Sequence, residues 1–326
     1  MTDYILRPFR STEQEYEALS SLLSTVSTER RPESGEDLKR EDRDWPEDSL
    51  LQRIAAYTPS GDMVGVGTCF QAYWQDSPFT VHLQFDIHPD HSQVHLAPVL
   101  YGGVQELLSH QRREFRRMVS RAKEDDSDRV QFLLRNGFRE EMRSPSSTLR
   151  VAEFDASACH RAYERLDEDK LRLITLAELY EEASDWKKRL RDLRWAIMQD
   201  VPSAEPFAKP TVAEFEEMVL RDPALDEEAF FVALAAEGCL IGMSNLWRND
   251  PEGRRLDTGL TGVIRLYRRR GIATALKMRT IQYALASGAE TIQTSNEEDS
   301  PMFALNQRLG FEPNAAWVDF VREMKA

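Results

Sequence analysis

Apolar residues recur along the chain in short runs typical of strands, separated by glycine turns and by amphipathic stretches typical of helices. The runs that follow Gly61 and Gly238 are each typical of a short strand entered through a turn. Gly137 and Gly310 each precede phenylalanine, which indicates a helix ended by glycine and a strand begun by an aromatic residue. In each half the pattern predicts strand, helical region, strands, helix, strand, helix, strand, and therefore an α/β (α+β) domain.

The matched positions in the two halves are separated by similar distances along the chain. Gly65 precedes Gly242 by 177 residues, and Gly137 precedes Gly310 by 173 residues. Near-constant offsets of this kind indicate a tandem duplication.

The duplication predicts two domains, residues 1–155 and residues 156–326. The polar, highly charged region 155–170 is predicted to be an exposed linking helix, and the boundary is placed near it. The charge-dense region 37–48 is predicted to be a mobile surface loop.

Composition narrows the class of protein. A chain of 326 residues is long enough for about two domains. Acidic residues outnumber basic ones 56 to 42, and the net charge of -14 disfavours a broad nucleic-acid surface. No run of eighteen apolar residues occurs, so we expect no contact with membranes through a spanning helix. The N-terminus lacks the shape of a signal peptide, and three distant cysteines without a C-x-x-C pair indicate reduced thiols in a cytoplasmic protein.

The chemistry is concentrated in residues 257–311. A predicted strand at 260–264 leads through an arginine-rich turn to Gly271, and a helix is expected from there to about Ser287, with Gly288 as its stop. The free N–H groups and the positive end of the dipole at a helix start favour an anion, and glycine allows close approach of the backbone. This segment therefore predicts a polyphosphate ligand. Two apolar stripes predict a well-packed helix, and their members are Ile272, Leu276, Tyr283, Ala275, Met278 and Leu285.

The pattern Arg268-x-x-Gly271-x-Ala273 resembles the R/Q-x-x-G-x-G/A signature of the GNAT acetyltransferase superfamily. Downstream, the segment 294–296 and the segment 301–311 resemble the later strand and helix of the same family. The resemblance covers residues 170–326, and a weaker one covers residues 1–150. It implies two tandem GNAT-like domains, each a mixed, mostly antiparallel sheet with splayed central strands flanked by helices. It also implies acetyl-CoA as cosubstrate.

The resemblance further implies which residues form the site. Backbone groups of residues 263–265 would pair with the pantetheine arm, and the N–H of Val263 or Ile264 would polarise the thioester carbonyl. Backbone N–H groups of residues 268–274 would bind pyrophosphate, and the arginines could reach a 3′-phosphate. The residues implied in coenzyme binding are Val263, Ile264, Arg265, Arg268, Arg269, Arg270, Gly271, Ile272, Ala273, Thr274, Asn296 and Asn306. The residues implied in catalysis are Asn306, Asn296 and the backbone of Val263.

Position 306 departs from the family pattern. Many GNAT enzymes have a tyrosine there that protonates the leaving thiolate, whereas Asn306 cannot transfer a proton. Tyr267 and Tyr283 are candidates for the acid by residue type alone. For the base, which must deprotonate the amine, the candidates are Asp257, Glu297 and Glu298, and the sequence does not choose among them.

The first domain is predicted to be a degenerate copy. In the matching segment Ser92 replaces the arginine and His95 replaces the glycine, so we expect this copy to have lost coenzyme binding. Four histidines lie between residues 82 and 95, but no cysteine or carboxylate cluster accompanies them, and Pro89 and Pro98 are expected to prevent one continuous helix. No metal is expected.

These observations favour a tandem N-acetyltransferase that is active in its second domain and acts on a small-molecule or peptide amine. Aminoacyl transfer from charged tRNA is disfavoured by the coenzyme motif and by the acidic charge. The alternative is a non-catalytic CoA-binding or interaction module with the same fold, for which Asn306 and the missing base are the arguments. A homodimer is possible, and the sequence does not decide it.

Overall fold

The computed structural model describes residues 4–26, 33–91, 93–155, 163–164, 166, 170–182, 184–248, 250 and 252–324. The chain divides into two compact units. Unit 1 comprises Met1–Arg143, Ala204–Pro206 and Ala315–Ala326, and unit 2 comprises Ser144–Ser203 and Phe207–Asn314. The predicted domain boundary at residues 155/156 borders residues outside the described part and remains a prediction.

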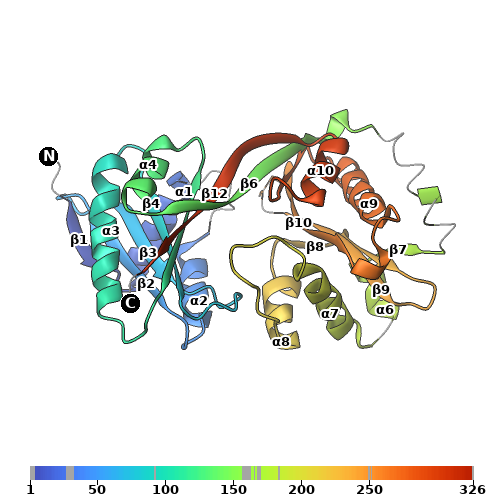
Figure 1. Ribbon diagram of the computed structural model, residues 1–326, viewed down its shortest axis with the longest axis horizontal. Coiled ribbons are helices and arrows are strands. Elements are labelled where there is room, and N and C mark those ends of the chain that lie inside the picture. Colours follow the sequence, from blue (N-terminus) through green and yellow to red (C-terminus); the bar gives the residue numbers. More distant parts are fainter. Residues whose placement is uncertain are drawn as a thin grey trace. The chain divides into compact units, whose positions relative to one another are not determined.

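Unit 1 is a mixed sheet with helices on both faces (Figure 1). Its strands follow the order β1-β2-β3-β4-β5-β12, and the pairs are antiparallel except for β4 with β5. Helices α3 and α4 contribute to the core on one face, and α1 and α2 contribute to the core on the other. The elements are β1 (Ile5–Pro8), α1 (Glu13–Val26), α2 (Gly35–Asp44), β2 (Leu51–Tyr57), β3 (Met63–Phe70), β4 (Thr80–Ile87), α3 (Gln93–Ser109), β5 (Arg117–Lys123), α4 (Ser127–Arg135) and β12 (Glu312–Glu323).

Unit 2 has the same arrangement, with strand order β6-β11-β10-β9-β8-β7. Only β10 and β11 pair in parallel among the strand pairs of its described residues. Helix α9 packs on one face of the sheet, and α6, α7 and α8 pack on the other (Figure 1). The elements are β6 (Arg139–Arg150), η1 (Val151–Glu153), β7 (Arg172–Thr175), α6 (Leu176–Glu182), α7 (Trp186–Met198), α8 (Val212–Phe215), η3 (Glu216–Leu220), β8 (Leu225–Leu234), β9 (Leu240–Trp247), β10 (Arg255–Val263), η4 (Arg265–Tyr267), α9 (Ile272–Ala286), β11 (Thr291–Ser295) and α10 (Pro301–Arg308).

Each unit is completed by a strand from the other half of the chain. Residues 317–323 of β12 pair with β5, and Val318 and Phe320 are buried in the core of unit 1. Residues 146–150 of β6 pair with β11, and Leu149 is buried in the core of unit 2. A fragment ending at residue 155 would therefore lack the strand that covers β5 in unit 1.

The prediction of a mobile loop at residues 37–48 is wrong, because most of this region lies in α2. The Ser34 hydroxyl accepts from the Asp37 N–H, and the Asp37 carboxylate accepts from the Ser34 N–H, which is a capping box. Leu38 is buried and fixes the helix to unit 1. The predicted linking helix at 155–170 falls largely on residues outside the described part.

Helix α9 confirms the predicted boundaries, since Gly271 precedes it with φ 85° and Gly288 follows it with φ 80°. The predicted apolar stripes are partly wrong, because Leu285 is 55 % exposed. Lys277 is instead buried, at 1 % exposure, beside the apolar residues of this helix.

Helix α3 bears on two expectations about unit 1. No continuous helix carries the four histidines, as expected, because His82 lies on β4 and His95 on α3, while Pro98 lies inside α3 with Leu96 and Leu100 buried beside it. His95 lies in the first turn of α3 and not in the turn before it, so its match to Gly271 is wrong. The position before the helix is Ser92, which is outside the described residues.

Two further findings concern cysteines and membranes. Cys69 and Cys239 are free thiols, and burial raises the pKa of Cys69 to about 12, while Cys159 lies outside the described residues. In the part of the chain that the structure describes, no helix is long and apolar enough to cross a membrane.

Candidate functional site

The central strands of unit 2 diverge. Strands β10 and β11 pair only over residues 255–257 and 291–293, although β10 continues to Val263 and β11 to Ser295. Beyond this point each strand is paired only on its outer side, β10 with β9 and β11 with β6. The inner edge of β10 therefore presents backbone groups that an extended ligand could pair with.

The hydrogen bonds of β10 separate the two candidate amides. The N–H of Ile264 donates to the Ile241 carbonyl at 3.0 Å, so it is occupied within the sheet. Val263 pairs with Gly242 in the adjacent position of this antiparallel ladder. Because hydrogen-bonded and non-hydrogen-bonded pairs alternate, the N–H of Val263 faces away from β9 and toward the divergence. Of the two, Val263 is therefore the residue whose N–H can reach a ligand there.

The start of α9 is open to an anion. Gly271 is the N-cap residue in the left-handed region, and no side chain accepts a hydrogen bond from the first turn. The Ala275 N–H donates to the Gly271 carbonyl, which leaves the N–H groups of residues 272–274 without helical acceptors. By contrast, Ser300 caps α10 by accepting from the Phe303 N–H at 3.1 Å, as its sequence predicts.

The arginines before Gly271 have different partners. Arg265 and Arg268 both bind the carboxylate of Asp200, just beyond the end of α7, and Arg268 Nε also donates to the Val263 carbonyl at 2.9 Å. The hydrogen bond from Arg265, followed by that from Arg268, lowers the pKa of Asp200 to about 2. Arg270 lies over the Tyr267 ring at 5.1 Å. Arg268 therefore secures the end of β10 and the turn, so its side chain is engaged within the protein and does not extend toward an incoming phosphate.

Two of the predicted catalytic residues meet. Asn306 on α10 is fully buried, and its Nδ2 donates to Asn296 Oδ1, just after β11, at 2.6 Å. Asn306 Oδ1 is buried and has no hydrogen-bond partner among the described residues. An orphaned polar atom of this kind carries a desolvation cost and is a common mark of a functional position.

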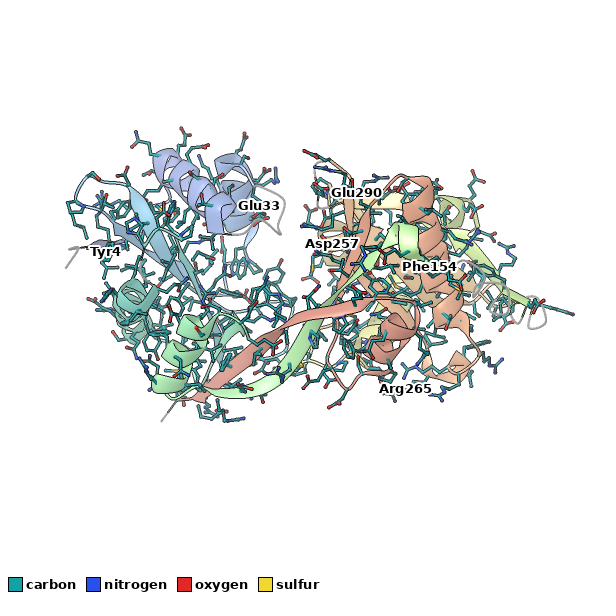
Figure 2. All side chains as sticks on the ribbon, turned by 90° about the horizontal axis from the view of Figure 1, so that it is seen from above. Tyr4, Glu33, Phe154, Asp257, Arg265 and Glu290 are labelled. Carbon is teal, nitrogen blue, oxygen red and sulfur yellow. The ribbon has the colours of Figure 1, made fainter. Side chains whose placement is uncertain are left out.

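The structure gives the surroundings of two candidates for proton transfer, Asp257 and Tyr283. Asp257, labelled in Figure 2, lies on β10 with its carboxylate 3.6 Å from Arg255. Tyr283 donates to Asp226 and accepts from Arg248. It lies twelve residues after Gly271, about 18 Å along the helix, so it is too far from the start of α9 to act there.

Two residues of the site have no signal in the sequence. Asp200 is 65 residues before Arg265, and only the fold brings the two together. Lys277 lies in α9, and its burial and its 3.3 Å contact with Thr258 Oγ1 depend on the packing of α9 against β10.

Unit 1 repeats the divergence of its central strands. Strands β4 and β5 pair in parallel only over residues 80–83 and 117–120, which repeats the divergence in unit 2. There the guanidinium of Arg129 on α4 donates to the Phe85 carbonyl beyond the paired residues. In unit 2 Arg268 likewise donates to a carbonyl of the matching strand, that of Val263 on β10, so this kind of contact is common to both units.

The histidines of unit 1 do not gather into a cluster. His82 is largely buried, its Nε2 lies 2.9 Å from Gln75 Oε1, and burial lowers its pKa to about 4. His91 contacts Tyr4 and His88. Across the described residues, no group of three potential metal ligands is placed to hold an ion.

Comparisons with known proteins agree with this geometry. Residues 187–311 match the model of the acetyltransferase (GNAT) family. The chain is similar to a tandem GNAT protein from the clavulanic acid biosynthesis pathway, at 18 % identity over 99 % of each chain, with a TM-score of 0.72. It is also similar to a GCN5-related N-acetyltransferase from Sphaerobacter thermophilus, at 15 % identity over 99 % of this chain and 96 % of that one, with a TM-score of 0.65. No curated protein sequence matches the chain.

Residues 187–311, which match the GNAT family model, lie in unit 2, and the whole chain has the fold of a tandem GNAT protein.

Proposed function

We propose that unit 2 transfers the acetyl group of acetyl-CoA to a primary amine of a small molecule or peptide by direct attack. The observation that carries the proposal is that a helix start without a side-chain cap follows a strand that diverges from its neighbour. The Val263 N–H, on the inner edge of β10, and the N–H groups of residues 272–274, at the start of α9, belong to elements separated only by the short η4.

The residues present fit the coenzyme. Backbone N–H groups at the start of α9, with Gly271 before them, suit a pyrophosphate. The inner edge of β10 suits an extended arm, and the unpartnered Asn306 Oδ1 leaves an acceptor for a polar group. When bound, acetyl-CoA supplies the acetyl group as a reactive thioester.

The protein's own groups would stabilise the developing negative charge and hold the residues of the site in position. The Val263 N–H would donate to the oxygen on which negative charge develops, a contact that stabilises a transition state more than a ground state. Asn296 holds the Asn306 amide at 2.6 Å and so fixes the orientation of the Asn306 side chain. Arg268, bound to the Val263 carbonyl, keeps this part of β10 in place.

Proton transfer is assigned to carboxylates and water. Asn306 has no proton to give, so the thiolate would leave without a dedicated acid. Asp257, Glu297 and Glu298 remain the candidates for the base, and Asp257 is the one on β10 itself.

The test is release of free thiol from acetyl-CoA by the full chain with a panel of primary amines, with the acetylated products identified by mass. Gly271→Glu should abolish CoA binding, because a carboxylate would stand at the place of the anion. Gly288→Glu is the matched control: it adds the same charge at the same left-handed conformation, at the other end of α9, with open space around it. Equal loss in both variants, or CoA affinity unchanged by Gly271→Glu, would refute the site.

A second function is a non-catalytic CoA-binding module. The asparagine at position 306, where the resemblance expects a proton donor, favours it. CoA binding that Gly271→Glu abolishes, combined with no thiol release across the amine panel, would identify the module instead of the enzyme.

A further inference from the structure

The last turn of α7 is fixed to the end of β10 by two contacts of different kinds. Ile197 packs against Gly262, where a Cβ would lie only 2.2 Å from Ile197 Cγ2. The Asp200 N–H donates to the Ile197 carbonyl at 3.0 Å, which places Asp200 one turn further along the chain. Its carboxylate binds two guanidinium groups, those of Arg265 and Arg268. An apolar contact and an ion pair thus join α7 to β10 and to the turn that follows β10.

Arg268 extends this contact to the backbone of Val263. Its Nε donates to the Val263 carbonyl at 2.9 Å, while its Nη2 binds Asp200. In a strand the N–H and the C=O of one residue point to the same side. The carbonyl that Arg268 binds therefore lies on the edge of β10 toward which the Val263 N–H faces. Through Arg268, Asp200 fixes the part of the backbone that would donate to the thioester oxygen.

Asp200 also opposes the charge of the coenzyme. Its two partners belong to the turn that leads into Gly271 and α9, where the pyrophosphate would bind. The hydrogen bonds from Arg265 and Arg268 lower the pKa of Asp200 to about 2, so its carboxylate is ionised at neutral pH. A negative charge here repels a bound phosphate and occupies two cations that could attract it. Asp200 therefore makes coenzyme binding weaker than the turn alone would allow.

We infer that Asp200 is a positioning residue for acetyl transfer in unit 2, which holds Arg268 and the Val263 backbone in place while it lowers the affinity for the coenzyme; this inference rests on the proposed function. The two effects have opposite signs when the charge is removed. Without the carboxylate, both guanidinium groups are left for the phosphates, and CoA binds more tightly. The Val263 backbone is then held less firmly, and turnover falls. Loss of a merely structural residue would instead weaken both.

The test compares the full-length wild type with Asp200→Asn, which keeps the shape of the side chain and removes its charge. Asp185→Asn is the matched control, because Asp185 is exposed at the other end of α7 and makes no side-chain hydrogen bond as its N-cap. CoA affinity is measured by calorimetric titration. Turnover is measured as thiol release from acetyl-CoA, with the amine of the panel that the wild type acetylates fastest.

Asp200→Asn should bind CoA roughly three to ten times more tightly than the wild type. Its kcat should be roughly 10- to 100-fold lower, because small displacements of a reacting geometry have effects of this size. Asp185→Asn should match the wild type in both measurements. CoA affinity that is unchanged or weaker in folded Asp200→Asn, or an unchanged kcat, would overturn the inference.

Two further variants separate the inference from misfolding and from an effect that bypasses Arg268. Asp200→Ser, which also suits a turn, is a second neutral variant with the same expected results, so misfolding of one variant does not decide the question. Arg268→Gln should lower kcat about as much as Asp200→Asn, and the double variant should lower it no further. Losses of kcat that multiply in the double variant would show that Asp200 does not act through Arg268, and would overturn the inference.

Absence of thiol release across the whole amine panel would instead reject the proposed function, and with it the role of Asp200 in turnover. The titrations then decide the other half of the inference, that Asp200 lowers the affinity for the coenzyme. Tighter CoA binding by Asp200→Asn and by Asp200→Ser would support it, and binding equal to that of the wild type would overturn it.

Discussion

At the residue scale, local backbone geometry places some groups of the site, and the packing of segments far apart in the chain places the others. Ser300, Pro301 and Gly310 act as cap, first helical residue and stop, because each role is set by local backbone geometry. The direction of Arg268 was not predictable, since its partners Asp200 and Val263 are defined by the fold. The burial of Lys277 escaped sequence reasoning for the same reason.

Lys277 makes the stability of unit 2 depend on pH. Burial lowers the pKa of its ammonium from 10.5 to about 7, so between these values the unfolded chain binds more protons than the folded one. The free energy of unfolding should therefore rise with pH, by roughly 2 kcal/mol from pH 7 to pH 9. Lys277→Met keeps a side chain of similar volume and removes the titrating amine. The variant should therefore have a higher free energy of unfolding than the wild type at pH 7, and it should lack the increase that Lys277 causes between pH 7 and pH 9.

Urea unfolding of both proteins at pH 7 and pH 9 checks this. The informative quantity is the difference between wild type and variant, because it cancels the other groups that titrate in this range. The same pH slope in both would show that Lys277 is not buried as a neutral amine.

At the element scale, the alternation of strands and helices was predictable, but the partners of the last strands were not. The periodicity that identifies β6 and β12 says nothing about the strand that each one pairs with, because that pairing joins residues far apart in the chain. Helix α2 was predicted to be a loop because the segment is rich in charged residues. Its capping box and the buried Leu38 stabilise it as a helix. The register of α3 was misjudged because no glycine marks its start.

The exchange of strands predicts where a core substitution acts. Phe320 lies near the end of the chain, yet it is fully buried in unit 1. Phe320→Ala should cost unit 1 roughly 3 to 5 kcal/mol. Hydrogen exchange should accelerate in β2 to β5 and not in α9.

Ile281→Ala is the matched control, because Ile281 is equally buried in the core of unit 2. It should accelerate exchange in α9 and leave β2 to β5 protected. Faster exchange in α9 after Phe320→Ala, with unit 1 unaffected, would contradict the assignment of β12.

At the scale of the whole molecule, the duplication was predictable from the near-constant offsets, and the two copies differ in the features that suit coenzyme binding. Unit 2 combines a helix start without a side-chain cap, Gly271 and a strand edge toward which the Val263 N–H faces. In unit 1 the Arg129 guanidinium takes the carbonyl of Phe85 at the matching divergence. The loss of coenzyme binding by the first copy stays a prediction from its sequence, and the match of His95 to Gly271 on which it was based fails.

The central claim is that one site, at the start of α9, binds acetyl-CoA. Calorimetric titration of the full-length chain with CoA tests it most directly. The account predicts one CoA per chain for the wild type and for Gly288→Glu, and none for Gly271→Glu. Two equivalents per chain, or one equivalent that persists in Gly271→Glu, would contradict it.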